Sequence, residues 1–197
     1  MQIPWLEIGL VLLLVVINAA FAGSEVALIS LREGQLRRLE REGEQGRLVA
    51  RLARDPNQFL STIQIGITLA GFLASAAAAV SLAQPLVPLL EGLGRAAEPV
   101  AVLLVTMVLT YLTLVVGELA PKRIALQRPE RWARRAARPL AVVSTLTRPA
   151  VWLLSKSTDL LVRLAGADPG RQREEVTEEE VRDMIATGAV FRPEQRR

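Results

Sequence analysis

The sequence predicts an all-α membrane protein with three transmembrane helices and an amphipathic juxtamembrane helical belt. Two observations predict this fold class. Of the 197 residues, 51% are hydrophobic, which exceeds what a soluble domain of this size needs for its core. Three apolar runs, at residues 8–30, 59–80 and 100–120, each reach the roughly 20 residues that a helix needs to cross the hydrocarbon layer. We therefore interpret residues 1–138 as a three-span transmembrane domain.

The charge of the connecting segments predicts the orientation of the spans. Residues 31–56 form a predicted helical loop with seven Arg, whereas residues 81–99 hold only Arg95. Lys and Arg gather again after the third span, at residues 121–138. Because loops rich in Lys and Arg stay in the cytoplasm, we expect the N-terminus outside and the C-terminus in the cytoplasm of a multi-pass protein of the plasma membrane. These Arg clusters beside the spans are topology signals, so we expect no binding of nucleic acid.

A fourth hydrophobic stretch, residues 139–166, is predicted to lie along the cytoplasmic interface. Its charged side chains fall within an arc of about 80° on a helix, which is the pattern of an amphipathic helix. The nearby Arg residues favour contact with anionic lipid. The alternative is a fourth crossing of the membrane. The charged positions are Arg148, Lys156, Asp159 and Arg163.

Residues 167–197 have the composition of a soluble linker. Thr177 and Glu180 have the spacing of a capping box, which predicts a short helix that ends near Ala186. An exposed helix of about two turns is marginal by itself. We therefore expect the sequence to be part of a longer protein with a cytosolic domain.

Two spans carry a carboxylate within the apolar run, Glu25 in the first and Glu118 in the third. A carboxylate at membrane depth normally faces a bundle interior or a wet cavity and has a partner there. We expect that partner to be a cation, and we rank Glu118 above Glu25. Glu25 lies on the same helix face as Asn18, which is its alternative partner.

The residue types that are absent restrict the chemistry. The sequence has no Cys and no His, which excludes disulfides, zinc sites of the His/Cys kind and Ser-His-Asp catalysis. The available ligands are oxygen atoms, which suit hard cations such as Mg²⁺, Ca²⁺ and Na⁺. We therefore expect a protein that is not an enzyme.

Pro121 lies three residues after Glu118 and affects the carbonyl groups near it. Proline has no N–H, so the carbonyl of Gly117 is predicted to lose its helical partner and to become available beside Glu118. A freed carbonyl next to an intramembrane carboxylate is a recurrent cation site in transporters. The alternative is that the proline ends the span and that Glu118 pairs with Lys122 or Arg123 at the interface.

The first two spans offer further oxygen atoms. Small residues recur every four positions in the second span, which lets helix backbones approach closely in lipid. Gly71 and Ser75 lie one turn apart there, so they can present a carbonyl and a hydroxyl to one point. Ser24 offers a hydroxyl in the first span, and its alternative role is a hydrogen bond to the carbonyl one turn earlier.

Three sequence runs carry a resemblance to a known family. They are NAAFAGSEVALIS at residues 18–30, FLSTIQIGITLAG at 59–71 and GELAPK at 117–122. In this order they resemble the transmembrane domain of the CorC/CNNM family of magnesium transporters. The resemblance implies a homodimer of three-span subunits with a juxtamembrane belt, followed in full-length members by cytosolic CBS domains that bind ATP. It also implies Mg²⁺ export, with coupling to Na⁺ proposed for the family.

The resemblance also implies an ion site between the spans, in a cavity open to the cytoplasm. On this sequence the site maps to Ser24, Gly71 or Ser75, Gly117 and Glu118. We expect Glu118 to supply charge, and the Ser hydroxyls and Gly carbonyls to supply further oxygens, to a Mg²⁺ that has shed much of its water. Relatives often have Ala or Leu at the position of Ser24, and Asn at that of Gly71. The alternative function is a membrane scaffold or regulator, in which Glu118 pairs only with basic neighbours.

Overall fold

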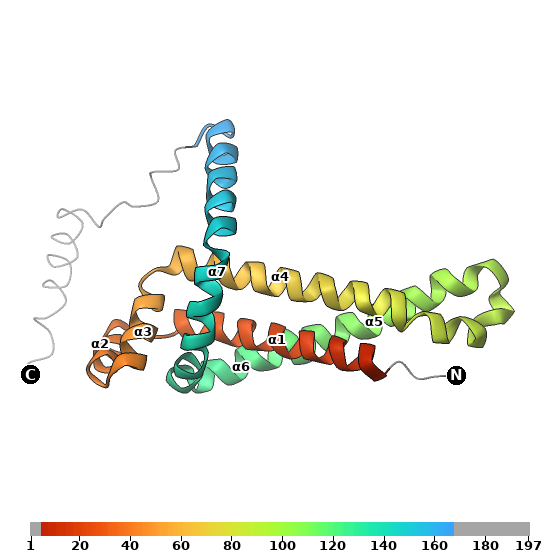
Figure 1. Cartoon of the computed structure of the whole chain (residues 1–197), viewed down its shortest axis with the longest axis horizontal. Helices are drawn as coiled ribbons and strands as arrows, with labels where there is room; N and C mark the ends of the chain where they lie inside the picture. Colours follow the sequence, from red (N-terminus) through yellow and green to blue (C-terminus); the bar gives the residue numbers. More distant parts are fainter. Residues whose placement is uncertain (1–4, 168–197) are drawn as a thin grey trace, which may run out of the picture. The chain divides into compact units, whose positions relative to one another are not determined.

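The computed structural model describes residues 5–167, and all regular secondary structure in that range is helical (Figure 1). Three of the described helical segments are long and apolar enough to cross a membrane. The predicted all-α fold with three spans is therefore confirmed. The chain divides after Val151 into two units, and the predicted helix at 177–186 lies outside the described residues.

The first span is α1, Trp5–Ile29, and the second is α4, Pro56–Ser81. Both helices begin about one turn before the predicted apolar run. The start of α4 at Pro56 follows from its sequence. The first N–H groups of a helix have no partner within it, so a proline, which has no N–H, loses nothing at this position. The Asp55 side chain caps the helix by accepting a hydrogen bond from the Gln58 N–H at 3.2 Å.

The third span is longer than predicted, because its helix does not end at Pro121. It begins as α5, Ala97–Leu114, passes through a π-helical turn, η2, Val115–Leu119, and continues as α6, Ala120–Gln127. A π turn pairs each N–H with the carbonyl five residues earlier, so the helix accommodates the proline by a local change of hydrogen-bond spacing. The helix therefore continues past Pro121 to Gln127, so the proline does not end it.

The connections between the spans are also helical. The predicted loop 31–56 contains α2, Glu33–Arg41, and α3, Glu44–Ala53. The second and third spans are joined by a 3₁₀ segment, η1, Gln84–Ala96. This segment is interrupted at Gly94, whose φ of 56° lies in the left-handed region that favours glycine.

The predicted amphipathic helix at 139–166 is the larger part of α7, Pro129–Leu164, a helix of 36 residues. Within the described range, α7 is not among the segments apolar enough to span a membrane. The structure therefore favours three spans over the four-span alternative.

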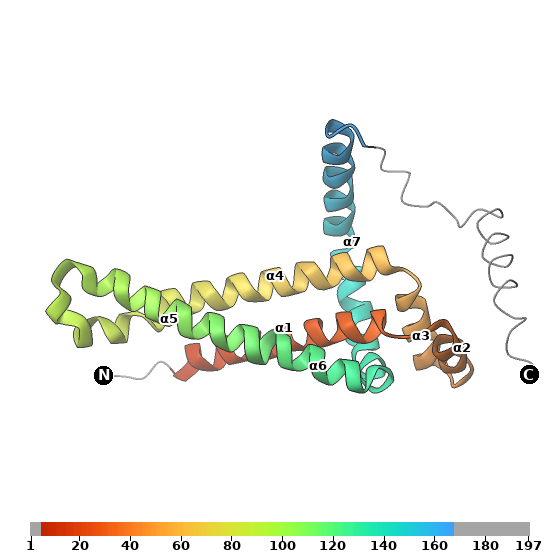
Figure 2. The ribbon, with the colours of Figure 1, turned by 180° about the vertical axis from the view of Figure 1, so that it is seen from behind.

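The helix α1 packs along α4 and along the continuous helix of η2 and α6 (Figures 1 and 2). Near the beginning of α1 the core is small and joins α1 to α4 and α5. Near the end of α1 a larger cluster, which we call the hub core, joins it to α2, α3, α4, α6 and the first turns of α7. The buried residues of the hub core are Ala27, Leu28, Leu31, Leu36, Leu39, Val49, Ala50, Phe59, Ile63, Ala125, Ala133, Ala137 and Leu140.

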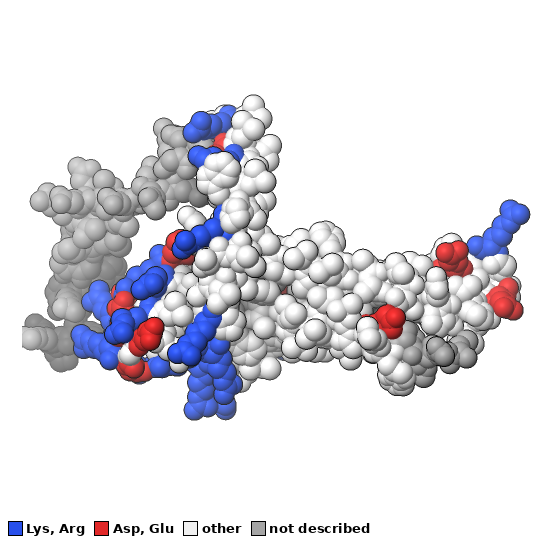
Figure 3. Space-filling model, in the orientation of Figure 1, with Lys and Arg blue, Asp and Glu red and all other residues white. Residues whose placement is uncertain are grey.

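Charged and apolar side chains occupy different parts of the unit that ends at Val151. Lys and Arg gather around α2 and α3, whereas the surface along the spans shows few charges (Figure 3). Large apolar side chains, including those of Leu69, Phe72 and Met107, are exposed along the spans. This distribution is that of helices in contact with lipid.

Ion pairs connect α2 to α3 and to α7. Arg54 at the end of α3 donates to both carboxylate oxygens of Glu40, at 2.6 and 3.1 Å, and to Glu33 at 3.0 Å. These hydrogen bonds hold the pKa of each glutamate below its ordinary value and raise the pKa of Arg54. Arg38 of α2 donates to Glu130 of α7 at 2.6 Å. Because exposed pairs add little stability each, the hub core contributes more than these charges to holding α2 and α3 in place.

At Gly46, α3 lies in close contact with α2. A Cβ at this position would overlap the backbone carbonyl of Leu39, which has no flexible end that could move aside. We therefore expect Gly46→Ala to lower the free energy of unfolding by about 1–3 kcal/mol, measured as a lower thermal unfolding midpoint. Gly34→Ala in α2 is the matched control, because a Cβ there meets nothing within 4 Å. Equal midpoints for the two variants would contradict this helix crossing.

Candidate functional site

The π turn of the third span lies against α1 at Asn18. The Nδ2 of Asn18 donates to the carbonyl oxygen of Gly117 at 3.1 Å. Pro121 has no N–H and so cannot donate the usual helical hydrogen bond to this carbonyl. The carbonyl accepts a hydrogen bond from the neighbouring helix α1 instead. Gly117 is buried, and a Cβ on it would lie 3.3 Å from the Asn18 Nδ2, so this close approach of the two helices favours glycine.

The Oδ1 of Asn18 is a buried acceptor without a hydrogen-bond partner among the described residues. The Asn18 side chain is 3% exposed, and a buried polar atom left unpaired normally costs free energy. An amide oxygen is also a ligand that hard cations accept. The sequence predicts Asn18 only as a partner of Glu25. An amide inside an apolar run is the signal that could have identified it.

Lys122 of α6 lies between two carboxylates. Its Nζ is 2.9 Å from Oε1 of Glu118 and 3.5 Å from Oε2 of Glu25. All three side chains are partly buried. The pair of Glu118 and Lys122 is the one that the alternative interpretation expects. The structure adds Glu25 from α1, so the cluster holds two acids and one base.

Ser24 interacts with α7 instead of with the π turn. Its Oγ donates to the Ala20 carbonyl at 2.6 Å, so the alternative role that the sequence gives it, a bond to the carbonyl one turn earlier, is confirmed. The same Oγ accepts a hydrogen bond from Nε1 of Trp132 at 3.4 Å. A Cβ at Gly23 would overlap the Trp132 ring, so glycine provides the space for this indole. No hydrogen bond joins Ser24 to Gly117 or Glu118.

Gly71 and Ser75 lie on an uncovered face of α4. Ser75 is exposed, and a Cβ at Gly71 would meet no atom within 4 Å. The buried face of α4 is the other row of small residues, Ala70, Ala74 and Ala78. The sequence shows two such rows and does not indicate which of them contacts α1.

The structure thus brings only part of the predicted ligand set together. Gly117 and Glu118 lie with Asn18, Glu25 and Lys122. The other predicted ligands lie elsewhere: Ser24 is hydrogen-bonded to Ala20 and Trp132, and Gly71 and Ser75 lie on the uncovered face of α4. Within residues 5–167, no three Asp or Glu side chains gather closely enough to hold a metal ion. A cation at the π turn would therefore depend on carbonyl, amide and hydroxyl oxygens beside one or two carboxylates. The complete set of five ligands stays a prediction.

Comparisons with known proteins bear on this arrangement. A family model described as the cyclin M transmembrane N-terminal domain, CNNM, matches residues 8–192. The UPF0053 protein sll0260 of Synechocystis is 43% identical over 188 residues, which are 93% of this chain and 42% of the relative. The UPF0053 inner membrane protein YfjD of Escherichia coli is 34% identical over 151 residues, 76% of this chain and 33% of the relative. UPF0053 protein YhdT of Bacillus subtilis is 32% identical over 178 residues, 88% of this chain and 39% of the relative. The chain spans less than half the length of these relatives.

Proposed function

Because this chain belongs to the CorC/CNNM family of membrane proteins, we propose that it transports Mg²⁺ across the plasma membrane, in the direction of export and coupled to Na⁺. Its three spanning segments make it a multi-pass membrane protein. Its candidate ligands are all oxygen atoms, which both ions prefer. In this proposal the chain has no catalytic role, and ATP binds only to the CBS domains of longer family members.

The observation that carries the proposal is the position of Glu118, which lies within the π turn and is paired with Lys122 at 2.9 Å. A cation that reaches this depth is attracted by the same carboxylate that holds the ammonium group. We propose that Mg²⁺ displaces Lys122 from Glu118 and that Lys122 returns when the ion leaves. Glu118 is then paired with a cation both when Mg²⁺ is bound and when it is absent. An unpaired carboxylate at membrane depth would be costly in both states.

The remaining ligands join the ion in this proposal when the helices shift. Mg²⁺ prefers six oxygens in near-octahedral geometry, and one carboxylate with one carbonyl is too few. The buried residues in the second half of α4 are Ala70, Ala74 and Ala78, and such small residues let neighbouring helices approach closely. Rocking of α4 against α1 is the movement that would bring Gly71 and Ser75 toward Ser24 and Glu118 and alternate the access to the site.

We also propose that the chain forms a homodimer. The face of α4 with Gly71 and Ser75 is uncovered in the single chain. Exposed Leu69 and Phe72 lie on the same helix, and large apolar side chains suit either lipid or a second membrane subunit. The family resemblance favours a second copy of this chain.

Ion flux in proteoliposomes tests the proposed function. The purified chain is reconstituted, and Mg²⁺ and Na⁺ gradients are set separately. We expect saturable Mg²⁺ movement, reported by a Mg²⁺-sensitive dye, that becomes faster when an opposing Na⁺ gradient is applied. The scaffold alternative predicts Mg²⁺ movement no faster than in liposomes without protein, and that result would remove the transport proposal.

A further inference from the structure

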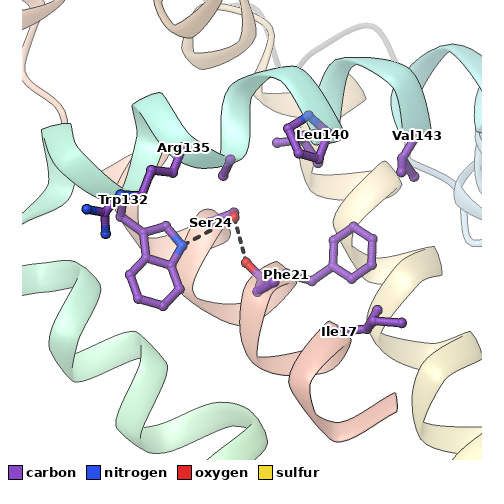
Figure 4. A pocket seen from close by; sticks show the side chains of 10 residues that line it. Ile17, Phe21, Ser24, Trp132, Arg135, Leu140 and Val143 are labelled. Carbon is purple, nitrogen blue, oxygen red and sulfur yellow. Dashed lines mark hydrogen bonds between the residues drawn. The ribbon is translucent and has the colours of Figure 1, made fainter. Parts of the chain in front are cut away.

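A cavity of about 460 Å³ lies between α1 and the first half of α7 (Figure 4). All the residues that line it belong to the unit that ends at Val151. Its walls are almost wholly apolar, and its volume is within the range of small-molecule sites. It shares Ser24 with the predicted ion site but none of the Glu118 cluster, so the Mg²⁺ proposal does not account for it.

The cavity has one polar end and one apolar end. Ser24, Trp132 and Arg135 lie toward one end, whereas Ile17 and Val143 lie toward the other (Figure 4). Ile17 and Ser24 are seven positions apart, which is about 10 Å along the axis of α1. With the orientation that the loop charges predict, the apolar end lies nearer the middle of the bilayer and the polar end nearer the cytoplasm. This gradient matches an inner-leaflet amphiphile.

The charge at the polar end is positive, and no carboxylate among residues 5–167 neutralises it. Arg131, Arg135 and Arg138 are exposed and fall within about 60° of one another around α7. None of the three has a carboxylate within 4.0 Å among the described residues, whereas the neighbouring Arg134 is paired with Glu42. Guanidinium groups bind phosphate oxygens well because their N–H groups match them in pairs.

We propose that this cavity binds one anionic phospholipid of the cytoplasmic leaflet, with an acyl chain along Ile17 and Val143 and the phosphate at Arg135. The apolar walls account for the acyl chain, and the unpaired Arg residues account for the preference for an anionic headgroup. Because the chain lies in a bilayer, phospholipid is the amphiphile present at the highest concentration. A bound lipid contacts both α1 and α7 and so stabilises the contact between Trp132 and Ser24.

Quenching of Trp132 fluorescence tests this proposal directly. The chain has three Trp, so Trp5→Phe combined with Trp152→Phe leaves Trp132 as the only indole. This variant, in detergent, is titrated with phosphatidylglycerol that carries brominated acyl chains, which quench on contact, and with phosphatidylcholine that carries the same chains. We expect saturable quenching by both, with half-saturation at about fivefold lower concentration for phosphatidylglycerol.

Two variants separate the cavity from general attraction of lipid to a basic surface. In the Trp132-only protein, Arg135→Gln is expected to remove most of the fivefold preference for phosphatidylglycerol. Ala136→Phe, which fills the cavity, is expected to abolish saturable quenching. Arg123→Gln is the matched control, because it removes the same charge as Arg135→Gln. Arg123 is exposed and does not line the cavity.

Three results would overturn the proposal. The first is equal half-saturation for the two lipids, which would indicate an acyl-chain site without a headgroup preference. The second is an equal loss of preference in Arg123→Gln and Arg135→Gln, which would indicate general electrostatics. The third is saturable quenching that persists in a folded Ala136→Phe variant. Circular dichroism and size-exclusion chromatography establish folding, and Arg135→Gln tests the headgroup contact even where Ala136→Phe does not fold.

Discussion

Glu118→Gln is expected to abolish Mg²⁺ binding by the purified protein while leaving the protein folded. Glutamine has nearly the size of glutamate and can still accept a hydrogen bond from Lys122, so the packing of the π turn is retained. It removes the negative charge, and a Mg²⁺ that has lost most of its water needs a charged oxygen ligand to offset that loss. Isothermal titration calorimetry with MgCl₂ should show no saturable heat, and flux in proteoliposomes should fall to the level of protein-free liposomes.

Glu98→Gln is the matched control for this prediction. Glu98 lies in the first turn of α5, on the same continuous helix as Glu118, and is exposed. The control should bind and transport Mg²⁺ like the unmodified chain. An unchanged Mg²⁺ affinity in Glu118→Gln would remove Glu118 from the ion site and leave its pairing with Lys122 as its only role.

Asn18→Leu is expected to lower the free energy of unfolding by about 1–2 kcal/mol. Leucine has a similar size but cannot donate to the Gly117 carbonyl, which is buried and would lose its partner on α1. Loss of the unpaired Asn18 Oδ1 offsets part of this cost. Because the same change removes an oxygen beside Glu118, Mg²⁺ binding should also weaken by about tenfold or more, the effect of losing one good ligand contact.

The control for this prediction is Asn57→Leu, since Asn57 is exposed near the start of α4. It should change neither the thermal unfolding midpoint nor the calorimetric Mg²⁺ affinity by a measurable amount. If Asn18→Leu unfolds at the same temperature as the Asn57→Leu control, the hydrogen bond to Gly117 contributes nothing. If it is destabilised but binds Mg²⁺ normally, Asn18 has a structural role alone.

The spans could be predicted from the sequence because an apolar segment of this length in lipid adopts a helix. Every backbone polar group must be paired inside the segment, and a helix does this. The course of the chain at Pro121 could not be predicted in the same way. The missing N–H indicates a freed carbonyl, but whether the helix then ends depends on a partner for Gly117. That partner, Asn18, lies 99 residues earlier in the sequence.

In the candidate site, too, contacts within one helix could be predicted from the sequence, whereas contacts between helices could not. Glu118 and Lys122 are four residues apart, so their pairing follows from helix geometry. The approach of Glu25 to Lys122 depends on the contact between α1 and α6, and the bond from Trp132 to Ser24 joins residues 108 positions apart. No spacing within one helix predicts these contacts.

The hub core has a mechanical consequence for regulation. Ala125 of α6 packs there with Ala133 and Ala137 of α7, and each is at most 1% exposed. Alanine has no side-chain torsion that could absorb a small displacement, so a rotation of the first half of α7 is transmitted to α6 as a rigid movement. Ala125 lies about two helical turns beyond Glu118. A force applied to α7 from outside the bilayer would therefore displace Glu118 relative to Lys122, and in the proposed transport it would change the affinity of Glu118 for the ion without any ligand entering the membrane.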